Sequence, residues 1–135
     1  MSFLPPQWQP SDTELADKTI LVTGASDGIG RAVALACAKV GAEVLLLGRN
    51  EGKLETVYDE ILRAGGREAG IIPLDLTTHD PTRYEALAEQ LTAADIILDG
   101  LVHNASVLGD RRLLAQTSPA SWQEVIQVNV SSTFL

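Results

Sequence analysis

Apolar residues occur along the chain in two patterns: short continuous runs and longer stretches with helical spacing. The continuous runs are rich in Val, Ile and Leu, which is typical of parallel strands buried on both faces. They cover residues 19–22, 43–47, 71–74 and 101–103. Helical spacing follows each run, at residues 29–40, 51–64, 81–93 and from 119 onward. This alternation predicts an α/β fold with one parallel sheet in the order 3-2-1-4.

The first predicted helix carries one apolar stripe made of Ile29, Val33, Cys37 and Val40. Intervals of four and three residues place these side chains on one face of a helix. Gly41 is expected to end the helix in a left-handed conformation. Cys37 is the only cysteine, and its place on the stripe indicates a packed core thiol. The sequence shows no disulfide framework and no metal-ligand cluster.

Local signals position the remaining elements. Pro73 has no backbone N–H to donate to a neighbouring strand, which favours an edge position for its own strand. Asp80 and Ser118 each precede a proline, a pattern typical of a helix start. Side chains of the second helix expected to face the sheet are Leu54, Val57, Ile61 and Leu62. Side chains of the third helix expected to be buried are Tyr84, Leu87, Ala88 and Leu91. Val125, Ile126, Val128 and Val130 indicate a buried final stretch.

The chain divides into an N-terminal arm and one folded unit. Residues 1–17 contain Pro5, Pro6 and Pro10, too many prolines for regular structure. We expect an extended arm that packs Phe3, Leu4 and Trp8 on the body. Residues 18–135 are predicted to form a single folded domain.

The run from Thr23 to Gly30 joins the first strand to the first helix. Its glycines allow a sharp turn and a close approach of the backbone to a ligand. The helix that follows presents unpaired amides and the positive end of its dipole to the same turn, where a pyrophosphate is favoured. The expected contacts of such a ligand are Gly24, Ser26, Asp27, Gly28, Ile29 and Gly30.

The spacing TGxxxGIG in this run resembles that of the short-chain dehydrogenase/reductase family, in particular its classical branch. Three further matches follow in order: Asp75-Leu76, His103-Asn104-Ala105-Ser106 and Asn129-Val130. The resemblance extends from Lys18 to the end of the chain. It implies a Rossmann-type doubly wound parallel sheet, truncated after the fourth strand and the start of the following helix. Residues 18–135 would then form an incomplete dinucleotide-binding domain that lacks its C-terminal catalytic part.

The end of the second strand selects the cofactor in this family. An acidic residue at the position of Gly48 would bind the ribose hydroxyls of NAD, which glycine cannot do. Arg49 offers a planar charged fork suited to a phosphate, so the resemblance implies NADP rather than NAD. Asp27 stands where some NADP-binding members carry a second basic residue. The alternative role for Arg49 is that of a solvated loop cation.

Further cofactor contacts are implied after the third and fourth strands. Asp75 would accept a hydrogen bond from the adenine amino group, and the Leu76 amide would contact the ring. A turn or helix cap is the alternative role for Asp75. Asn104 is expected to stabilise the central sheet and approach the ribose on the adenosine side. Ala105 is expected to leave room for the cofactor backbone.

The segment 103–106 departs from the family pattern NNAG at its first and last positions. Ser106 replaces a glycine, and a positive φ there would cost roughly 1 kcal/mol of strain. His103 is interpreted as a strand-end histidine satisfied by hydrogen bonds rather than as an acid or base.

Asn129 matches the asparagine that supports a proton relay in the resembling enzymes. Their catalytic serine and YxxxK motif lie beyond the matched region, and neither Tyr58 nor Tyr84 is followed four residues later by lysine. The complete protein would transfer a hydride between NADP(H) and a small-molecule carbonyl or secondary alcohol substrate. These 135 residues alone are expected to be inactive. The alternatives are a non-catalytic nucleotide-binding module and an inactive fragment of the fold.

Charge and composition restrict the partners. A net charge of −8 argues against a nucleic-acid partner. Residues 24–53 carry four basic and three acidic side chains, so the predicted cofactor region is the least acidic part. No apolar run suits a membrane span or signal peptide, so we expect a cytoplasmic protein. In the family, helices such as the one from Pro119 build subunit contacts, which implies a homo-oligomer.

Overall fold

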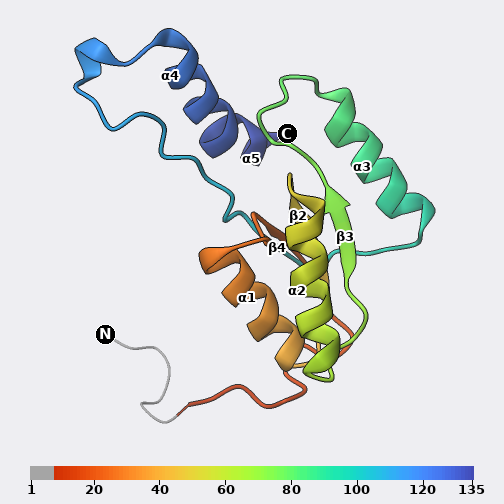
Figure 1. The fold of residues 1–135 in the computed structure, drawn as a ribbon. Helices are drawn as coiled ribbons and strands as arrows, with labels where there is room; N and C mark the ends of the chain where they lie inside the picture. Colours follow the sequence, from red (N-terminus) through yellow and green to blue (C-terminus); the bar gives the residue numbers. More distant parts are fainter. Residues whose placement is uncertain (1–7) are drawn as a thin grey trace.

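Four strands make up the sheet: β1 (Thr19–Thr23), β2 (Glu43–Gly48), β3 (Gly70–Pro73) and β4 (Gly100–Val102). They are parallel and lie in the order β3-β2-β1-β4 in a computed structural model that describes residues 8–135 (Figure 1). The predicted α/β architecture and strand order are therefore confirmed. Pro73 lies on the edge strand, where its missing donor breaks no ladder.

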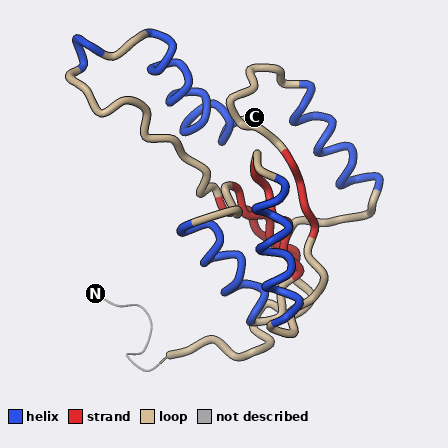
Figure 2. The backbone as a smooth tube through the Cα atoms, in the orientation of Figure 1, coloured by secondary structure: helices blue, strands red, loops and turns tan. Residues whose placement is uncertain are grey.

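The helices are α1 (Gly28–Lys39), α2 (Glu51–Arg63), α3 (Thr82–Ala93), α4 (Pro119–Ile126) and α5 (Ser132–Phe134), with a 3₁₀ turn at Leu114–Gln116 and a π-helical segment at Gln127–Ser131. Side-chain caps begin three of them, from Asp27, Asn50 and Ser118. The loop after β4 leads away from the sheet to α4 (Figure 2). None of the helices within residues 8–135 combines the length and the apolar character that crossing a bilayer demands.

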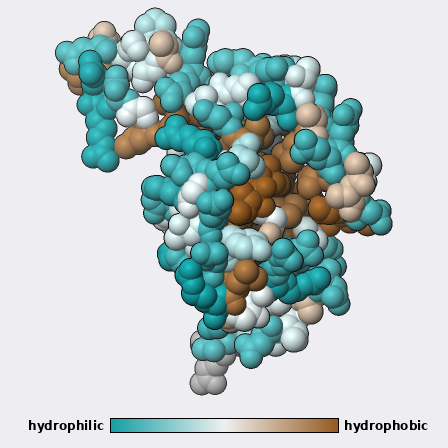
Figure 3. Space-filling model, turned by 45° about the vertical axis from the view of Figure 1, so that its right-hand side comes forward, coloured by the Kyte–Doolittle hydropathy of each residue, from teal (hydrophilic) through white to brown (hydrophobic). Residues whose placement is uncertain are grey.

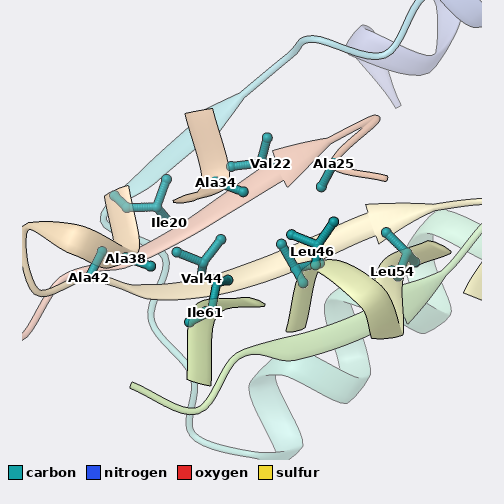
Figure 4. Close-up of a cluster of buried hydrophobic side chains, with 11 residues drawn as sticks. Ile20, Val22, Ala25, Ala34, Ala38, Ala42, Val44, Leu46, Leu54 and Ile61 are labelled. Atoms are coloured by element: carbon teal, nitrogen blue, oxygen red, sulfur yellow. The ribbon is translucent and has the colours of Figure 1, made fainter. Parts of the chain in front are cut away.

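Alternate residues of the two central strands enter two separate cores, because successive side chains of a strand point to opposite faces. On one face, Ile20, Val22, Val44 and Leu46 pack against α1 and α2 (Figure 4). On the other, Leu21, Leu45 and Leu47 pack with side chains of α3 and the loops beside it. The first face is the better covered, since residues such as Leu46 and Leu54 are completely inaccessible to solvent.

The second face of the sheet is only partly covered. Tyr84, Leu87 and Leu91 of α3 are half-buried there. Ala88 lies on the same side of α3 but is exposed, so its predicted burial is wrong. A cavity of about 290 Å³ lies over this face, between α3 and the last residues of the chain. Figure 3, which brings the α3 side forward, shows hydrophobic residues gathered in a hollow.

Two apolar side chains that the sequence places on helix stripes, Ile29 and Leu62, are exposed. Ile29 is 75% exposed, and the buried residues of α1 are Gly30, Ala34 and Ala38. The predicted stripe was displaced because the helix packs closely against the sheet through its small residues, while Val33 and Cys37 flank the core. Leu62 is 43% exposed beside the buried Ile61. Burial raises the pKa of the Cys37 thiol, in agreement with a packed position.

The N-terminal arm differs from the extended, docked segment expected. Phe3, Leu4, Pro5 and Pro6 lie outside the described residues. Trp8 is 47% exposed, so its predicted packing is wrong. Residues 12–17 form turns, and Leu15 packs on the core while its N–H donates to the Val40 carbonyl at 2.9 Å. This contact attaches the arm beside Gly41, which has the expected positive φ.

The last stretch of the chain is less buried than its apolar sequence indicates. Gln127 and Val128 are buried, but Ile126 is partly exposed and Val130 is 55% exposed. The π-helical segment changes the helical phase here, because its hydrogen bonds join residues five apart instead of four. The Gln127 side-chain amide donates to the Thr78 carbonyl at 2.6 Å, which links this segment to the loop after β3.

Ile61→Ala is expected to lower the free energy of unfolding by about 2–5 kcal/mol, because it leaves a cavity in the core under α2. Leu62→Ala, on the adjacent solvent-facing position, is expected to cost less than about 1 kcal/mol. Urea denaturation followed by circular dichroism measures both. Equal losses for the two variants would contradict the assignment of the buried face.

Candidate functional site

The carboxyl ends of β1 and β4 are joined by side-chain hydrogen bonds from Thr23 and Asn104. The buried Thr23 hydroxyl accepts from the N–H groups of Asn104 and Ala105, at 3.0 and 3.1 Å, and donates to the Val102 carbonyl at 3.3 Å. The Asn104 amide in turn donates to the carbonyls of Thr23 and Gly24, at 3.0 and 3.3 Å. The expected role of Asn104 in holding the central sheet agrees with these contacts.

Glycines at two positions permit this close packing. Gly24 has a φ of +67°, and a Cβ added to it would lie 2.9 Å from the Ala105 Cα atom. A Cβ on Gly30 would overlap the Gly24 carbonyl oxygen and the Asn104 amide. The turn, the start of α1 and the segment after β4 are therefore in backbone contact, with no space for a side chain between them.

A cleft of about 440 Å³ opens at the carboxyl edge of the sheet, next to this contact. Most of the predicted binding residues line it: Gly24, Ser26, Asp27, Gly28, Ile29, Arg49, Asp75, Leu76, Asn104 and Ala105. Gly30 supports the turn from the α1 side. The cleft lies where the order of the strands reverses between β1 and β4, the usual ligand position in open α/β sheets.

Asp27 caps α1 at the mouth of the cleft. Its Oδ1 atom accepts from the Gly28 N–H at 2.8 Å, and its Oδ2 atom is 3.0 Å from the Lys53 ammonium. The hydrogen bond from Lys53, followed by that from Gly28, holds the pKa of the Asp27 carboxyl below its ordinary value. Sequence reasoning missed Lys53 as a neighbour of the site, because 26 residues separate it from Asp27.

Gly48 and Arg49, at and directly after the end of β2, form one wall of the cleft. A Cβ on Gly48 would lie 3.3 Å from the Leu54 side chain and 3.7 Å from the Ser26 hydroxyl, so little space is left for a side chain at this position. Arg49 is exposed, and its guanidinium forms no ion pair with any residue in 8–135. It lines the cleft with its charge uncompensated.

Asp75 closes a turn and also lines the cleft. Its Oδ1 atom accepts from the Thr77 N–H at 3.0 Å, which closes a turn after β3. The residue is exposed and lines the cleft together with Leu76 and Thr77. Thr77 was not predicted; its place two residues after an aspartate is the signal that would have indicated it.

The two departures in segment 103–106 have simple structural outcomes. Ser106 lines the cleft without a positive φ, so the conditional strain does not arise. His103 is exposed and makes no side-chain hydrogen bond to the residues the structure describes, so the prediction of a satisfied histidine is wrong.

Asn129 lies in the π-helical segment and does not itself line the cleft. It is exposed, but its amide is paired with the backbone of Val107: Oδ1 accepts from the N–H and Nδ2 donates to the carbonyl, both at 2.9 Å. Val107 and Val128 line the cleft, and sequence reasoning missed both. The contact that joins their two segments, between Val107 and Asn129, spans 22 residues, so no local sequence pattern could have predicted that these valines line the cleft.

Comparison with known proteins matches residues 18–135 to the family described as short chain dehydrogenase. The uncharacterized oxidoreductase YciK of Escherichia coli is 45% identical over 128 residues, which is 95% of this chain and 51% of that protein. Two crystal structures, of a Shigella flexneri chain complexed with NADP and an Escherichia coli chain complexed with NADPH, are 44% and 46% identical, each with a TM-score of 0.88. They cover 92% and 93% of this chain. The chain covers 52% of each, about half their length.

Thr23→Val is expected to lower the free energy of unfolding by about 1–3 kcal/mol, because two backbone N–H groups lose their acceptor at a buried position. Thr92→Val removes an exposed hydroxyl that donates to the Ala88 carbonyl, and it is expected to change stability by no more than about 0.5 kcal/mol. Urea titrations of both variants provide the comparison. A neutral Thr23→Val would disprove the importance of the hydroxyl.

Proposed function

The chain belongs to the short chain dehydrogenase family, and we propose that its cleft binds the adenosine and pyrophosphate part of a nicotinamide dinucleotide, with NADP(H) preferred to NAD(H). The observation that carries the proposal is the convergence of the glycine turn, Arg49 and Asn104 on one cleft. These residues come from three different connections of the sheet.

The glycine turn fits a pyrophosphate on steric and electrostatic grounds. Gly24 and Gly30 allow the close packing that shapes the turn, and Gly28, which lines the cleft, leaves open space where a Cβ would stand. The N-terminus of α1 reaches the cleft through Gly28 and Ile29, so the positive end of the helix dipole is directed to an anion there. Ile29 is largely exposed, and a bound nucleotide would cover this apolar side chain.

The preference for NADP(H) rests on the wall formed by Gly48 and Arg49. Gly48 offers no carboxylate to a ribose hydroxyl, whereas the neighbouring guanidinium is uncompensated and suited to bidentate binding of phosphate. The related structures complexed with NADP and NADPH support this choice. On the adenine side, we assign Asp75 and Leu76 as contacts of the ring.

For the whole protein we propose oxidoreductase activity on a carbonyl or secondary alcohol. The bound nicotinamide would supply or accept the hydride. This chain contributes the binding and orientation of the nucleotide, and residues 18–135 act as the cofactor-binding unit. Asn129 is proposed to support a proton relay, and its paired amide also fixes the position of Val107 at the cleft.

Isothermal titration with NADPH and NADH tests cofactor binding. We expect tighter binding of NADPH, and Arg49→Ala is expected to weaken it about tenfold or more while leaving NADH binding within about twofold, since only NADPH carries the phosphate. Arg63→Ala removes an arginine paired with Asp59 on the exposed side of α2 and serves as control. Failure of the unmodified chain to bind either nucleotide would contradict the proposal.

We further propose that the chain self-associates. Trp122, Ile126, Val130 and Phe134 expose large apolar side chains along α4 and the segments after it. Exposed apolar clusters of this kind favour association. Light scattering is expected to show a mass that rises with concentration and falls for Trp122→Glu. A concentration-independent monomer would rule this out.

A further inference from the structure

Two charged side chains line the cleft on the side proposed for the nucleotide phosphate, and a third pairs with one of them. Arg49 and Asp27 line the cleft, and Lys53 forms an ion pair with Asp27. Asp27 is unexpected here, because an acidic group opposes the binding of an anion. Its side chain is 76% exposed, so solvent weakens but does not remove its field.

The Asp27 carboxylate is fixed in this position by its role in α1. One oxygen accepts from the Gly28 N–H at the start of the helix. Rotation of the side chain away from the cleft would break this cap. The negative charge therefore remains at the mouth, and only a neighbouring cation can compensate for it.

Lys53 is held in a position where its ammonium can compensate for the charge of Asp27. It lies in the first turn of α2, and its backbone N–H donates to the Asn50 side chain at 3.0 Å. Asn50 immediately follows Arg49, so Arg49 directly after β2 and Lys53 in the first turn of α2 are only four positions apart. The ammonium then reaches across to α1 and meets the second oxygen of Asp27 at 3.0 Å.

Stability alone does not explain this pair. Both side chains are more than half exposed, and exposed ion pairs contribute little to folding. The pair lies directly beside the cleft, however, where the sum of nearby charges acts on any bound anion. Its effect is therefore expected in the choice of ligand rather than in the free energy of unfolding.

We propose that Lys53 is a specificity-determining residue, which neutralises Asp27 and so permits the cleft to prefer a nucleotide with a 2′-phosphate. This inference rests on the proposed binding of a nicotinamide dinucleotide. Arg49 provides the attraction for the phosphate, and Lys53 removes the repulsion that Asp27 would otherwise exert on it.

The test compares the affinities of NADPH and NADH for Lys53→Gln, Asp27→Asn and the double variant. Asparagine retains the ability to cap α1. Lys53→Gln is expected to weaken NADPH binding about fivefold and to change NADH binding by less than about twofold. Asp27→Asn is expected to tighten NADPH binding about threefold, and the double variant is expected to return to within about twofold of the unmodified chain. Higher salt is expected to reduce all these differences.

Lys18→Gln is the matched control, since Lys18 pairs with Asp99 at 2.8 Å beside the amino ends of β1 and β4, at the opposite edge of the sheet. It is expected to leave the ratio of the two affinities unchanged. Equal weakening of NADPH and NADH by Lys53→Gln would reduce Lys53 to a structural role and overturn the inference. A double variant that keeps the full loss would also overturn it, because Lys53 would then act independently of Asp27.

Arg49→Ala separates this inference from the proposed function. Selective NADPH binding that depends on Arg49 but not on Lys53 would overturn the inference alone. No binding of either nucleotide by the unmodified chain would overturn both.

Discussion

The Thr23 hydroxyl is the contact on which the site depends. It lies at the end of β1 and forms hydrogen bonds with three backbone groups of β4 and the segment after it. The Asn104 side-chain amide donates two hydrogen bonds, to the carbonyls of Thr23 and Gly24, in the turn that precedes α1. Because these hydrogen bonds connect the glycine turn to the segment after β4, the two segments form one continuous side of the cleft.

Close packing on one face of the sheet allows this side of the cleft to form. The buried positions of α1 are glycine and alanine, so the helix lies directly on β1 and its first turn reaches the cleft. The larger side chains that complete this core come from the strands and from α2. On the opposite face, α3 leaves leucines of the sheet beside an open cavity, so the closer packing that supports the site is on the α1 and α2 side.

Charge then distinguishes the two ends of the same sheet. At the amino ends of β1 and β4, Lys18 and Asp99 pair away from the cleft. At the carboxyl ends, Asp27 and Lys53 pair while Arg49 faces the cleft without a counter-ion among the described residues. A chain with a net charge of −8 thus presents a basic group where a phosphate is proposed to bind.

The sequence by itself determined the strand order, the glycine turn and most residues around the cleft. The elements and the glycine turn follow from local rules: apolar runs, helix starts, and glycines where the backbone must turn. The cleft residues after the second, third and fourth strands follow from the resemblance to the short-chain dehydrogenase/reductase family. Tertiary structure alone decided that Ile29 and Leu62 face solvent, that Lys53 meets Asp27, and that Asn129 holds Val107. Helical spacing shows which side chains share one face of a helix, but it does not show how closely that face packs against the sheet. Contacts between residues more than 20 positions apart depend on how the elements are placed in space, which no short window of sequence contains.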